Sequence, residues 1–449
     1  MNTNKKLDEL QEKTLNLDWI KSKIKIKQLS KDFHWFSPVL AIQLANKKAE
    51  LAVKPKNELE LKQLISICSK LKVNLTVRGG GTGNYGQAVP LHGGVLIDMS
   101  DYKDIHSLSE LDGIAYVQSG IKLVDLEDAA KSKGWELRCM PSTYKMATLG
   151  GLFSGGFGGI GSINYGPVAA SGTIMSIRVM TISEEPEVLE VRGPELTDFH
   201  HTYGTNGIII DIEIALAPAR EWHEYLISFN TLEQALNFST LLANSSAIDT
   251  RNVALFDAYS AGHFEQTPSD LSPLKYIVIV IIASNGLTAM FDLIASNEGN
   301  IEWSQTAEQM NSSKQTLMEC CWNHSTLHAL KFNKKLTYLQ TEYDVESVAE
   351  QLLSIKTDAN NEVQIHLEFI RMSDSALTIV GLPLIHYKNE ERLIEIVKIH
   401  NKYGVSINDP HVYTLEDGKH KGCFNRSILE SKRKNDPLNL LNVGKIRTL

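Results

Sequence analysis

The sequence predicts an α+β fold with more than one domain, and three observations support this prediction. The chain has 449 residues, more than one hydrophobic core usually organises, so two or three domains are expected. Short strand-like segments alternate with helix-like segments along the chain. Two glycine-rich loops, at residues 78–86 and 141–161, lie in its first half. Glycine lets backbone N–H groups approach an anion closely, so paired loops indicate a ligand gripped at two places.

Composition narrows the class of protein. Hydrophobic residues make up 43% of the chain and charged residues 22%, as in globular proteins. The net charge of −8 argues against general nucleic-acid binding, which needs a basic face. Five cysteines lack C-x-x-C spacing, so we expect reduced, buried thiols in a cytoplasmic protein, with no iron–sulfur cluster and no metal site. They are Cys68, Cys139, Cys320, Cys321 and Cys423.

Residues 1–43 are predicted to form a polar leader without a signal peptide. The longest apolar run, Tyr276 to Ala283, is far shorter than the roughly 20 residues of a membrane helix and is predicted to be a buried strand. Lysines alternate in the leader from Lys21 to Lys27. We interpret this segment as a solvated, lysine-protected strand edge. The alternative is an electrostatic contact with acidic lipid, which would place the protein peripherally at the inner face of a membrane.

The next segments predict a first domain over residues 44–220. A helix is signalled from Asn57, with an apolar stripe at Leu61, Leu64, Ile65, Cys68 and Leu71. Strands are expected at 73–77, before the first glycine loop, and at 95–97 after it. A second helix is expected at 123–133, with Gly134 as its C-cap. Isoleucines at alternate positions from 208 to 214 predict one face of a strand that ends at Pro218.

The pattern changes after residue 220. Strand-like and helix-like segments predict an α+β region over residues 221–404, with no strong internal repeat. The expected strands are 225–229, 276–284, 300–304, 363–370 and 376–384, and the expected helices are 231–243, 285–296 and 389–401. Residues 405–449 form a C-terminal segment.

Context excludes two common nucleotide motifs for the first loop. Its Gly81-x-Gly83-x-x-Gly86 spacing matches a dinucleotide fingerprint, but the expected helix does not follow. No Lys-Ser or Lys-Thr follows the glycines, so it is not a Walker loop. A strand, a glycine-rich turn and a second strand therefore cup the anion.

This arrangement resembles the first phosphate loop of the vanillyl-alcohol oxidase, or p-cresol methylhydroxylase (PCMH), type of FAD-binding domain. The resemblance continues through Val117–Gly120, Pro141–Thr143, Ala147–Gly151 and Tyr203–Ile209, and the order follows the glycolate-oxidase flavin-subunit and D-lactate-dehydrogenase branch. The tail of that branch ends in Leu-Leu-Asn-Pro-Gly-Lys, and this chain has Leu440 to Lys445 with Val443 in the proline's place.

The resemblance implies a two-subdomain FAD-binding domain, an α+β, ferredoxin-like cap over the flavin, and a tail that returns to the flavin. It also implies two phosphate and ribityl contact regions, a strand whose backbone contacts adenine, and a tail contact with the isoalloxazine. The implied cofactor-binding residues are Arg78, Gly79, Gly80, Gly81, Thr82, Gly83, Asn84, Tyr85 and Gly86 in the first loop, Pro141, Ser142, Thr148, Gly150, Gly151, Ser154, Gly155 and Gly156 in the second, Ile208 and Ile209 on the strand, and Asn442 and Lys445 in the tail.

Thr82 stands where several relatives carry a histidine bonded to the flavin, so non-covalent FAD is expected. His92, beyond Pro90, is expected to be a surface histidine. For Asn442 and Lys445, the alternative is a plain helix end at Gly444.

Hydride transfer from a CH–OH donor also needs a base for the hydroxyl proton. His411 is our candidate, although the Glu-His-Gly and histidine metal motifs of relatives are missing here. Arg371 could clamp a substrate carboxylate or form a surface ion pair. His324 and His328 have metal-ligand spacing, but a polar pocket wall is favoured because no third ligand is evident. Tyr338 and His366 could also line the pocket, or His366 could be a core residue.

The resemblance therefore implies an FAD-dependent oxidoreductase acting on a small D-2-hydroxy acid such as lactate or glycolate. Two alternatives remain open. The donor could be a sugar alcohol, an aldonolactone or a prenyl-linked sugar, or the chain could be a flavin-binding subunit without its own turnover. The electron acceptor is unidentified.

Overall fold

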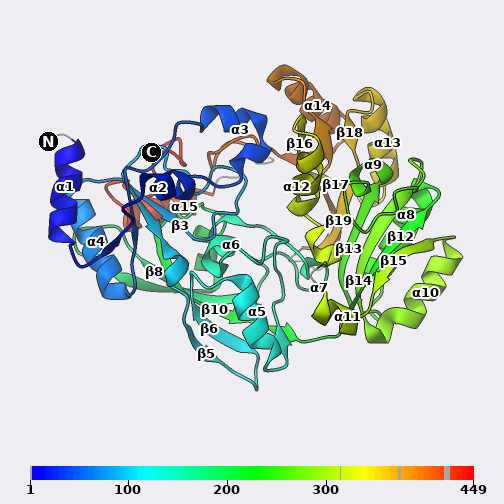
Figure 1. Cartoon of the computed structure of the whole chain (residues 1–449), viewed down its shortest axis with the longest axis horizontal. Helices are drawn as coiled ribbons and strands as arrows, with labels where there is room; N and C mark the ends of the chain where they lie inside the picture. Colours follow the sequence, from blue (N-terminus) through cyan, green and yellow to red (C-terminus); the bar gives the residue numbers. More distant parts are fainter. Residues whose placement is uncertain (1–2, 314, 373–375, 419–424) are drawn as a thin grey trace.

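The fold has two lobes, shown in Figure 1. The computed structural model describes residues 3–313, 315–372, 376–418 and 425–449. The first lobe contains the N-terminal half of the chain and its C-terminal tail, drawn in blue to cyan and in red on the left of the view. The second lobe, which we call the cap, contains the green to orange elements on the right. The α+β fold class is confirmed.

The first subdomain of the first lobe is built on a four-stranded sheet in the order β1-β2-β4-β3. β2 and β3 both pair with β4 in parallel, and β1 pairs with β2 antiparallel. Its elements are α1 (Thr3–Lys13), β1 (Asp18–Trp19), α2 (Lys23–Leu29), η1 (His34–Phe36), α3 (Pro38–Gln43), β2 (Leu51–Lys54), α4 (Glu58–Leu71), β3 (Leu75–Arg78), β4 (Val95–Asp98) and η2 (Met99–Asp101).

The predicted helix after Asn57 is confirmed as α4. The Asn57 side chain caps it by accepting a hydrogen bond from the Glu60 amide at 3.0 Å. The stripe buries Leu61, Leu64 and Ile65 against β3 and β4 residues in one core.

The predicted strand edge at residues 21–27 is wrong, because this segment forms the helix α2. Ser22 caps the helix by accepting from the Lys25 amide at 3.3 Å. Ile26 and Leu29 lie three residues apart and pack into a small core with Ala49 and Ala52. The alternation of lysine and isoleucine imitates a strand, but this packing selects the helix.

The second subdomain is a five-stranded antiparallel sheet in the order β5-β6-β10-β8-β9. β10 serves two cores, because a bulge between Ile209 and Asp211 shifts its register. Ile208 and Ile210 pack in the first subdomain, whereas Ile212 and Ile214 pack in the second. The elements are β5 (Ile105–Leu108), β6 (Ile114–Gln118), α5 (Leu123–Lys131), β7 (Trp135–Glu136), α6 (Leu149–Gly155), α7 (Ser162–Tyr165), β8 (Ile174–Met180), β9 (Val188–Arg192), η3 (Gly193–Asp198), β10 (Ile208–Ala215) and β11 (Ala217–Pro218).

The cap is an eight-stranded antiparallel sheet in the order β15-β12-β14-β13-β19-β20-β17-β22. Each half is a β-α-β-β-α-β unit, and β13 joins β19 at the centre. The first unit comprises β12 (Trp222–Phe229), α8 (Leu232–Asn244), β13 (Thr250–Asp257), β14 (Tyr276–Ala283), α10 (Leu287–Ser296) and β15 (Asn300–Gln305). The second comprises β17 (Gln340–Tyr343), α13 (Val348–Asp358), β19 (His366–Arg371), β20 (Leu377–Gly381), α14 (Glu390–Lys402) and β22 (Ser406–Asn408).

The expectation of no internal repeat is therefore wrong at the level of structure. The predicted segments fell on elements of both units, but β13, β17, α13 and β22 were missed, which hid the symmetry. Smaller cap elements are α9 (Ala258–Ala261), η4 (Ser284–Gly286), α11 (Ala307–Ser312), η5 (Leu317–Glu319), α12 (Asn323–Phe332) and a sheet of β16 (Leu336–Tyr338), β21 (Leu384–His386) and β18 (Val363–Gln364).

The tail returns to the first lobe through α15 (Arg426–Asn435), and Leu441 forms a parallel bridge with Leu75 at the start of β3. Four cysteines are buried free thiols, namely Cys68, Cys139, Cys320 and Cys321, while Cys423 lies outside the described residues. Across the described ranges, no helix combines the length and apolarity needed to cross a bilayer.

Candidate functional site

A cavity of about 510 Å³ lies between the two lobes. Both glycine-rich loops line it, together with residues 200–209 of the first lobe and residues of the cap. Most of the predicted cofactor-binding residues meet there. Those that line the cavity are Arg78, Gly79, Gly80, Gly81, Thr82, Gly83, Asn84, Tyr85, Pro141, Ser142, Thr148, Gly150, Gly151, Ser154, Gly155, Gly156 and Ile209; Gly86, Ile208, Asn442 and Lys445 do not.

The first glycine loop presents an unusual run of unused donors. It leaves β3 after Arg78 and runs along the cavity wall. No backbone N–H of residues 80–86 donates a hydrogen bond to another described residue. Backbone N–H groups with access to a cavity are normally paired, so this run fits a bound anion such as a diphosphate.

Two glycines of this loop are needed because the second loop lies directly against it. A Cβ on Gly79 would lie 2.1 Å from Thr148 Oγ1, and a Cβ on Gly80 would lie 2.2 Å from the Met146 carbonyl oxygen. Any larger residue would push the loops apart. The contact is reinforced by Gln87, whose Nε2 donates to the Gly155 carbonyl at 2.6 Å.

Thr148 and Ser154 are engaged within the second loop. Thr148 caps α6 by accepting from the Gly151 amide at 3.2 Å, and the Ser154 hydroxyl donates to the Gly150 carbonyl at 2.7 Å. Ser142 keeps its side chain for other partners, since no hydrogen bond joins it to a described residue. The ordered spacing of this loop therefore has a structural cause as well as a place on the cavity.

Arg78 does not direct its charge into the cavity. Its Nη1 donates to the carbonyl oxygens of Leu29 and Lys31, at 2.6 and 2.5 Å, and thus closes the end of α2. Burial lowers the pKa of its guanidinium from the ordinary value. Arg78 lines the cavity as predicted for the loop, but its guanidinium is engaged by the end of α2.

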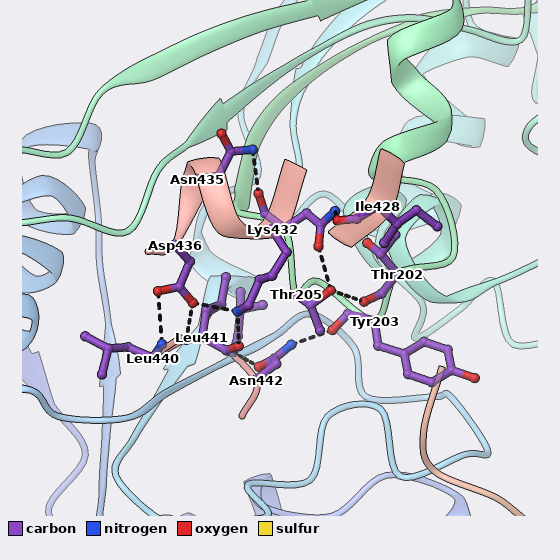
Figure 2. A network of polar contacts seen from close by, with 12 residues as sticks. Thr202, Tyr203, Thr205, Ile428, Lys432, Asn435, Asp436, Leu440, Leu441 and Asn442 are labelled. Atoms are coloured by element: carbon purple, nitrogen blue, oxygen red, sulfur yellow. Dashed lines mark hydrogen bonds and ion pairs between the residues drawn. The ribbon is translucent and has the colours of Figure 1, made fainter. Parts of the chain in front are cut away.

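The tail residues hold the loop from behind rather than touching the cavity. Asn442 accepts from the Val77 amide at 3.1 Å and donates to the Tyr203 carbonyl, as Figure 2 shows for the Tyr203 contact. Lys445 donates from Nζ to the Gly86 carbonyl. The tail therefore fastens both ends of the first glycine loop, at Val77 and Gly86. The expected contact with the isoalloxazine is not supported.

A buried ion pair stiffens this tail. Lys432 Nζ lies 2.6 Å from Asp436 Oδ2 and 2.8 Å from the Leu441 carbonyl (Figure 2). The same carboxylate accepts from the amides of Leu440 and Leu441 at 2.9 and 2.8 Å. Every group is paired, which is the condition for burying charge at low cost. Asn435 extends the contact by donating to the Asn206 carbonyl at 3.0 Å.

His411 is held by other parts of the chain and does not line the cavity. Its Nε2–H donates to the Tyr338 carbonyl at 3.0 Å, so Nδ1 accepts from the Ser37 hydroxyl at 2.7 Å. Burial lowers the pKa of the ring from its ordinary value. Both nitrogens are occupied, so the geometry does not support His411 as the base.

Arg371 also lies away from the cavity. Its Nη2 donates to the Ala243 carbonyl at the end of α8, at 2.8 Å. A substrate in the cavity would not meet this side chain, so the geometry does not support a carboxylate clamp there.

The remaining histidine candidates lie outside the cavity lining. Burial lowers the pKa of His324 to about 4, and His328 Nε2 donates to the Glu319 carbonyl at 3.0 Å. His366 is buried between Ser325 and Glu368, at 2.9 Å from each. Neither these residues nor Tyr338 line the cavity. Within the described ranges, no group of three or more histidine, cysteine, aspartate or glutamate side chains could hold a metal ion.

Sequence reasoning missed most of the cap wall. The missed lining residues include Trp322, Asn323, Gln340, Thr341, Glu342, Val380, Leu382, Asn408, Asp409 and Asp417. They carry no glycine-type signature, so no local pattern marked them. His200 and His201 were missed in the first lobe, where the pair beside Tyr203-Gly204 was an available signal.

Residues 49–189 match the family model described as an FAD binding domain. This chain has an FAD-binding domain. The match covers both glycine loops, and the unused amides and the cavity fit that cofactor.

Similar proteins carry names of hydroxy-acid enzymes. The glycolate oxidase subunit GlcD of Escherichia coli is 27% identical over 202 residues, covering 43% of this chain and 40% of that protein. A D-lactate dehydrogenase of Archaeoglobus fulgidus is 28% identical over 235 residues, covering 47% and 51%. The mitochondrial D-2-hydroxyglutarate dehydrogenase of Arabidopsis thaliana is 25% identical over 179 residues, covering 38% and 31%. The matches thus span about half or less of each relative.

A solved structure agrees over nearly the whole chain. Alkyldihydroxyacetonephosphate synthase superposes with a TM-score of 0.76 at 15% identity, covering 98% of this chain and 86% of that one. At this identity the likeness shows the fold alone, and it includes the cap as well as the FAD-binding domain.

Proposed function

We propose that this chain is an FAD-dependent oxidoreductase that removes a hydride from the CH–OH carbon of a small donor. The observation that carries the proposal is the run of unused amides at residues 80–86 in a cavity that the cap closes. Bound FAD would supply the hydride acceptor, at N5 of its ring. The first loop would bind its diphosphate through backbone N–H groups.

Glu342 is the residue that we propose as the base. Three carboxylates line the cap side of the cavity, on Glu342, Asp409 and Asp417. Asp409 accepts from the His411 amide at 2.8 Å, and Asp417 accepts from the Thr414 hydroxyl at 2.6 Å. Glu342 Oε1 and Oε2 accept no hydrogen bond from the described residues, so either oxygen can take the donor's hydroxyl proton.

The names of the relatives support a D-2-hydroxy acid, such as lactate or glycolate, as the donor. One observation favours a second candidate, a neutral donor such as a sugar alcohol or aldonolactone. Among the described lining residues, Arg78 is the one lysine or arginine, and its guanidinium is already engaged by α2. Among the described residues of that wall, a carboxylate would therefore find no free lysine or arginine.

An anaerobic donor screen tests the function. Purified yellow protein is mixed with D-lactate, glycolate, D-2-hydroxyglutarate, xylitol or an aldonolactone, and the flavin's visible absorbance is followed. Bleaching by at least one donor is expected. A yellow protein that none of them reduces would favour a flavin-binding subunit without its own turnover.

We also propose that FAD is bound without a covalent bond. Thr82 lines the cavity in the first loop, and its hydroxyl cannot form the histidyl link of some relatives. Acid precipitation should therefore release the yellow colour into the supernatant. A yellow pellet would contradict this part of the proposal.

A further inference from the structure

The helix α2 carries an exposed basic face that the flavin chemistry does not use. Its lysines and those of the adjoining segments are exposed, and none forms an ion pair with a described residue. They are Lys21, Lys23, Lys25, Lys27, Lys31, Lys47 and Lys48. The two segments are neighbours, because the Ala49 amide donates to the Ser30 hydroxyl at the end of α2, at 3.0 Å.

Protection of a strand edge does not explain these lysines. The segment is a helix, so it offers no unpaired ladder to a second strand. Acidic groups to balance the lysines are also scarce. Between residues 20 and 56 the carboxylates are those of Asp32 and Glu50. Asp32 is buried and bound to His34, and Glu50 accepts from the Gly94 amide.

An isoleucine stands at the centre of this basic face. Successive residues of a helix are rotated by about 100°. Ile26 and Leu29 form the buried side of α2, so Ile24 points to the opposite, solvent side, between Lys27 and Lys25 around the helix axis. It is 74% exposed. Ile42 in the neighbouring helix α3 is 78% exposed.

A protein face with exposed lysines around an exposed apolar residue suits one kind of binding partner. A bilayer with acidic headgroups attracts the lysines and takes up the isoleucine at its interface. Nucleic acid would satisfy the charges but not Ile24. We propose that α2 and residues 47–48 dock this protein peripherally on an anionic lipid bilayer.

Hydrogen bonds connect the end of α2 and the residues after it to the first glycine loop of the flavin cavity. Arg78, which begins the first glycine loop, donates to the carbonyls of Leu29 and Lys31 at the end of α2. The Phe33 amide donates to the Gly83 carbonyl at 2.8 Å. Docking would therefore hold the first glycine loop next to the membrane surface.

Vesicle sedimentation of the full-length, FAD-loaded protein tests the proposal. The vesicles contain phosphatidylcholine alone or phosphatidylcholine with phosphatidylglycerol. Binding to the mixed vesicles should exceed binding to the neutral ones more than about 10-fold. It should weaken as salt shortens the screening length from about 10 Å at 0.1 M to about 3 Å at 1 M.

Matched variants locate the surface. Lys23→Gln, Lys25→Gln and Lys27→Gln together should reduce binding by about 100-fold, since each lysine contributes about fivefold. The control combines Lys62→Gln, Lys70→Gln and Lys398→Gln, three exposed lysines of α4 and α14, and should change binding little for the same change in net charge. Ile24→Ser should weaken binding to the mixed vesicles about fivefold, even with all lysines present.

Three results would overturn the proposal. The first is equal binding to neutral and mixed vesicles, and the second is equal loss in the α2 and control triple variants. The third is binding to a duplex DNA fragment as tight as to mixed vesicles, with no effect of Ile24→Ser on either, which would identify a general polyanion surface. None of these readouts needs donor oxidation, so the outcome is independent of the donor screen.

Discussion

The first-lobe wall of the cavity is made largely of glycine backbone, whereas the cap wall is made of side chains from β17, β20 and residues 408–418. The first wall offers repeated N–H groups, which suit a diphosphate. The second offers varied groups, including Trp322, Gln340 and Glu342, which suit recognition of a particular donor. Under the proposed function, the first wall would bind the cofactor and the second the donor, so variants in the two walls should have separable effects.

The largest change in rate is expected from a substitution in the cap wall. Glu342→Gln should lower the rate of flavin reduction by the donor about 10²–10⁴-fold, because the amide cannot take the hydroxyl proton. FAD affinity should not change. Rapid-mixing absorbance measures the rate, and Glu346→Gln, an exposed residue just beyond β17, is the control. A Glu342→Gln protein that is reduced normally would remove Glu342 from the mechanism.

A change in the first wall should weaken FAD binding rather than slow the reduction of bound flavin. Gly80→Ala places a Cβ 2.2 Å from the Met146 carbonyl, which forces the two loops apart. FAD affinity should fall about 100-fold, equivalent to about 2.8 kcal/mol. Fluorescence titration of the FAD-free protein measures it. Gly134→Ala is the control, because its positive φ is strained but no atom lies within 4 Å of the added Cβ. Equal FAD affinity in both variants would mean that the loop contact is unimportant.

The tail supports the first wall and should matter less. Asn442→Ala leaves the Val77 amide and the Tyr203 carbonyl without a partner, which should cost about 2–4 kcal/mol of unfolding free energy. FAD affinity should fall about 10-fold because the loop is less well positioned. Asn439→Ala is a close control, since Asn439 has a similar φ of 49° but no side-chain hydrogen bond to a described residue. Urea unfolding and FAD titration would separate the two, and identical results would contradict the role of the tail.

Lys445 should give the protein a pH-dependent stability without touching the cavity wall. Burial lowers the pKa of Lys445 to about 7 in the folded protein, against about 10.4 when unfolded. Between these values the unfolded chain binds more protons, so the unfolding free energy rises with pH. Below about pH 7 both states are protonated and the cost of burying the charge is fully present. The stability of Lys445→Met relative to the wild type should therefore be greatest below pH 7 and decline towards pH 10. Urea midpoints across this range measure it, and a constant difference would contradict the depressed pKa.

The sequence predicted the glycine wall of the cavity better than the cap wall. The glycine loops were found because close backbone contact requires glycine at fixed positions, such as Gly79 and Gly80 against Thr148 and Met146. The cap helices and strands were mostly found by periodicity. Their pairing into two β-α-β-β-α-β units was not, because register and strand order depend on contacts between distant residues.

The geometry does not support His411 as the base, and the sequence could not show this for the same reason. His411 stands in a polar segment, and its neighbours in sequence do not reveal that Ser37 occupies its Nδ1 from 374 residues away. Asn442 and Lys445 were recognised as important, but the sequence cannot show that they hold Val77 and Gly86 from behind. The helix α2 was mistaken for a strand because alternate lysines obscured its two buried residues, Ile26 and Leu29.

Amide hydrogen–deuterium exchange over residues 79–87, with and without FAD, tests the central claim most directly. The N–H groups of residues 80–86 have no described partner in the FAD-free chain, so they should exchange fast and become strongly protected when FAD binds. Protection elsewhere with unchanged exchange at 80–86 would show that this loop does not bind the cofactor.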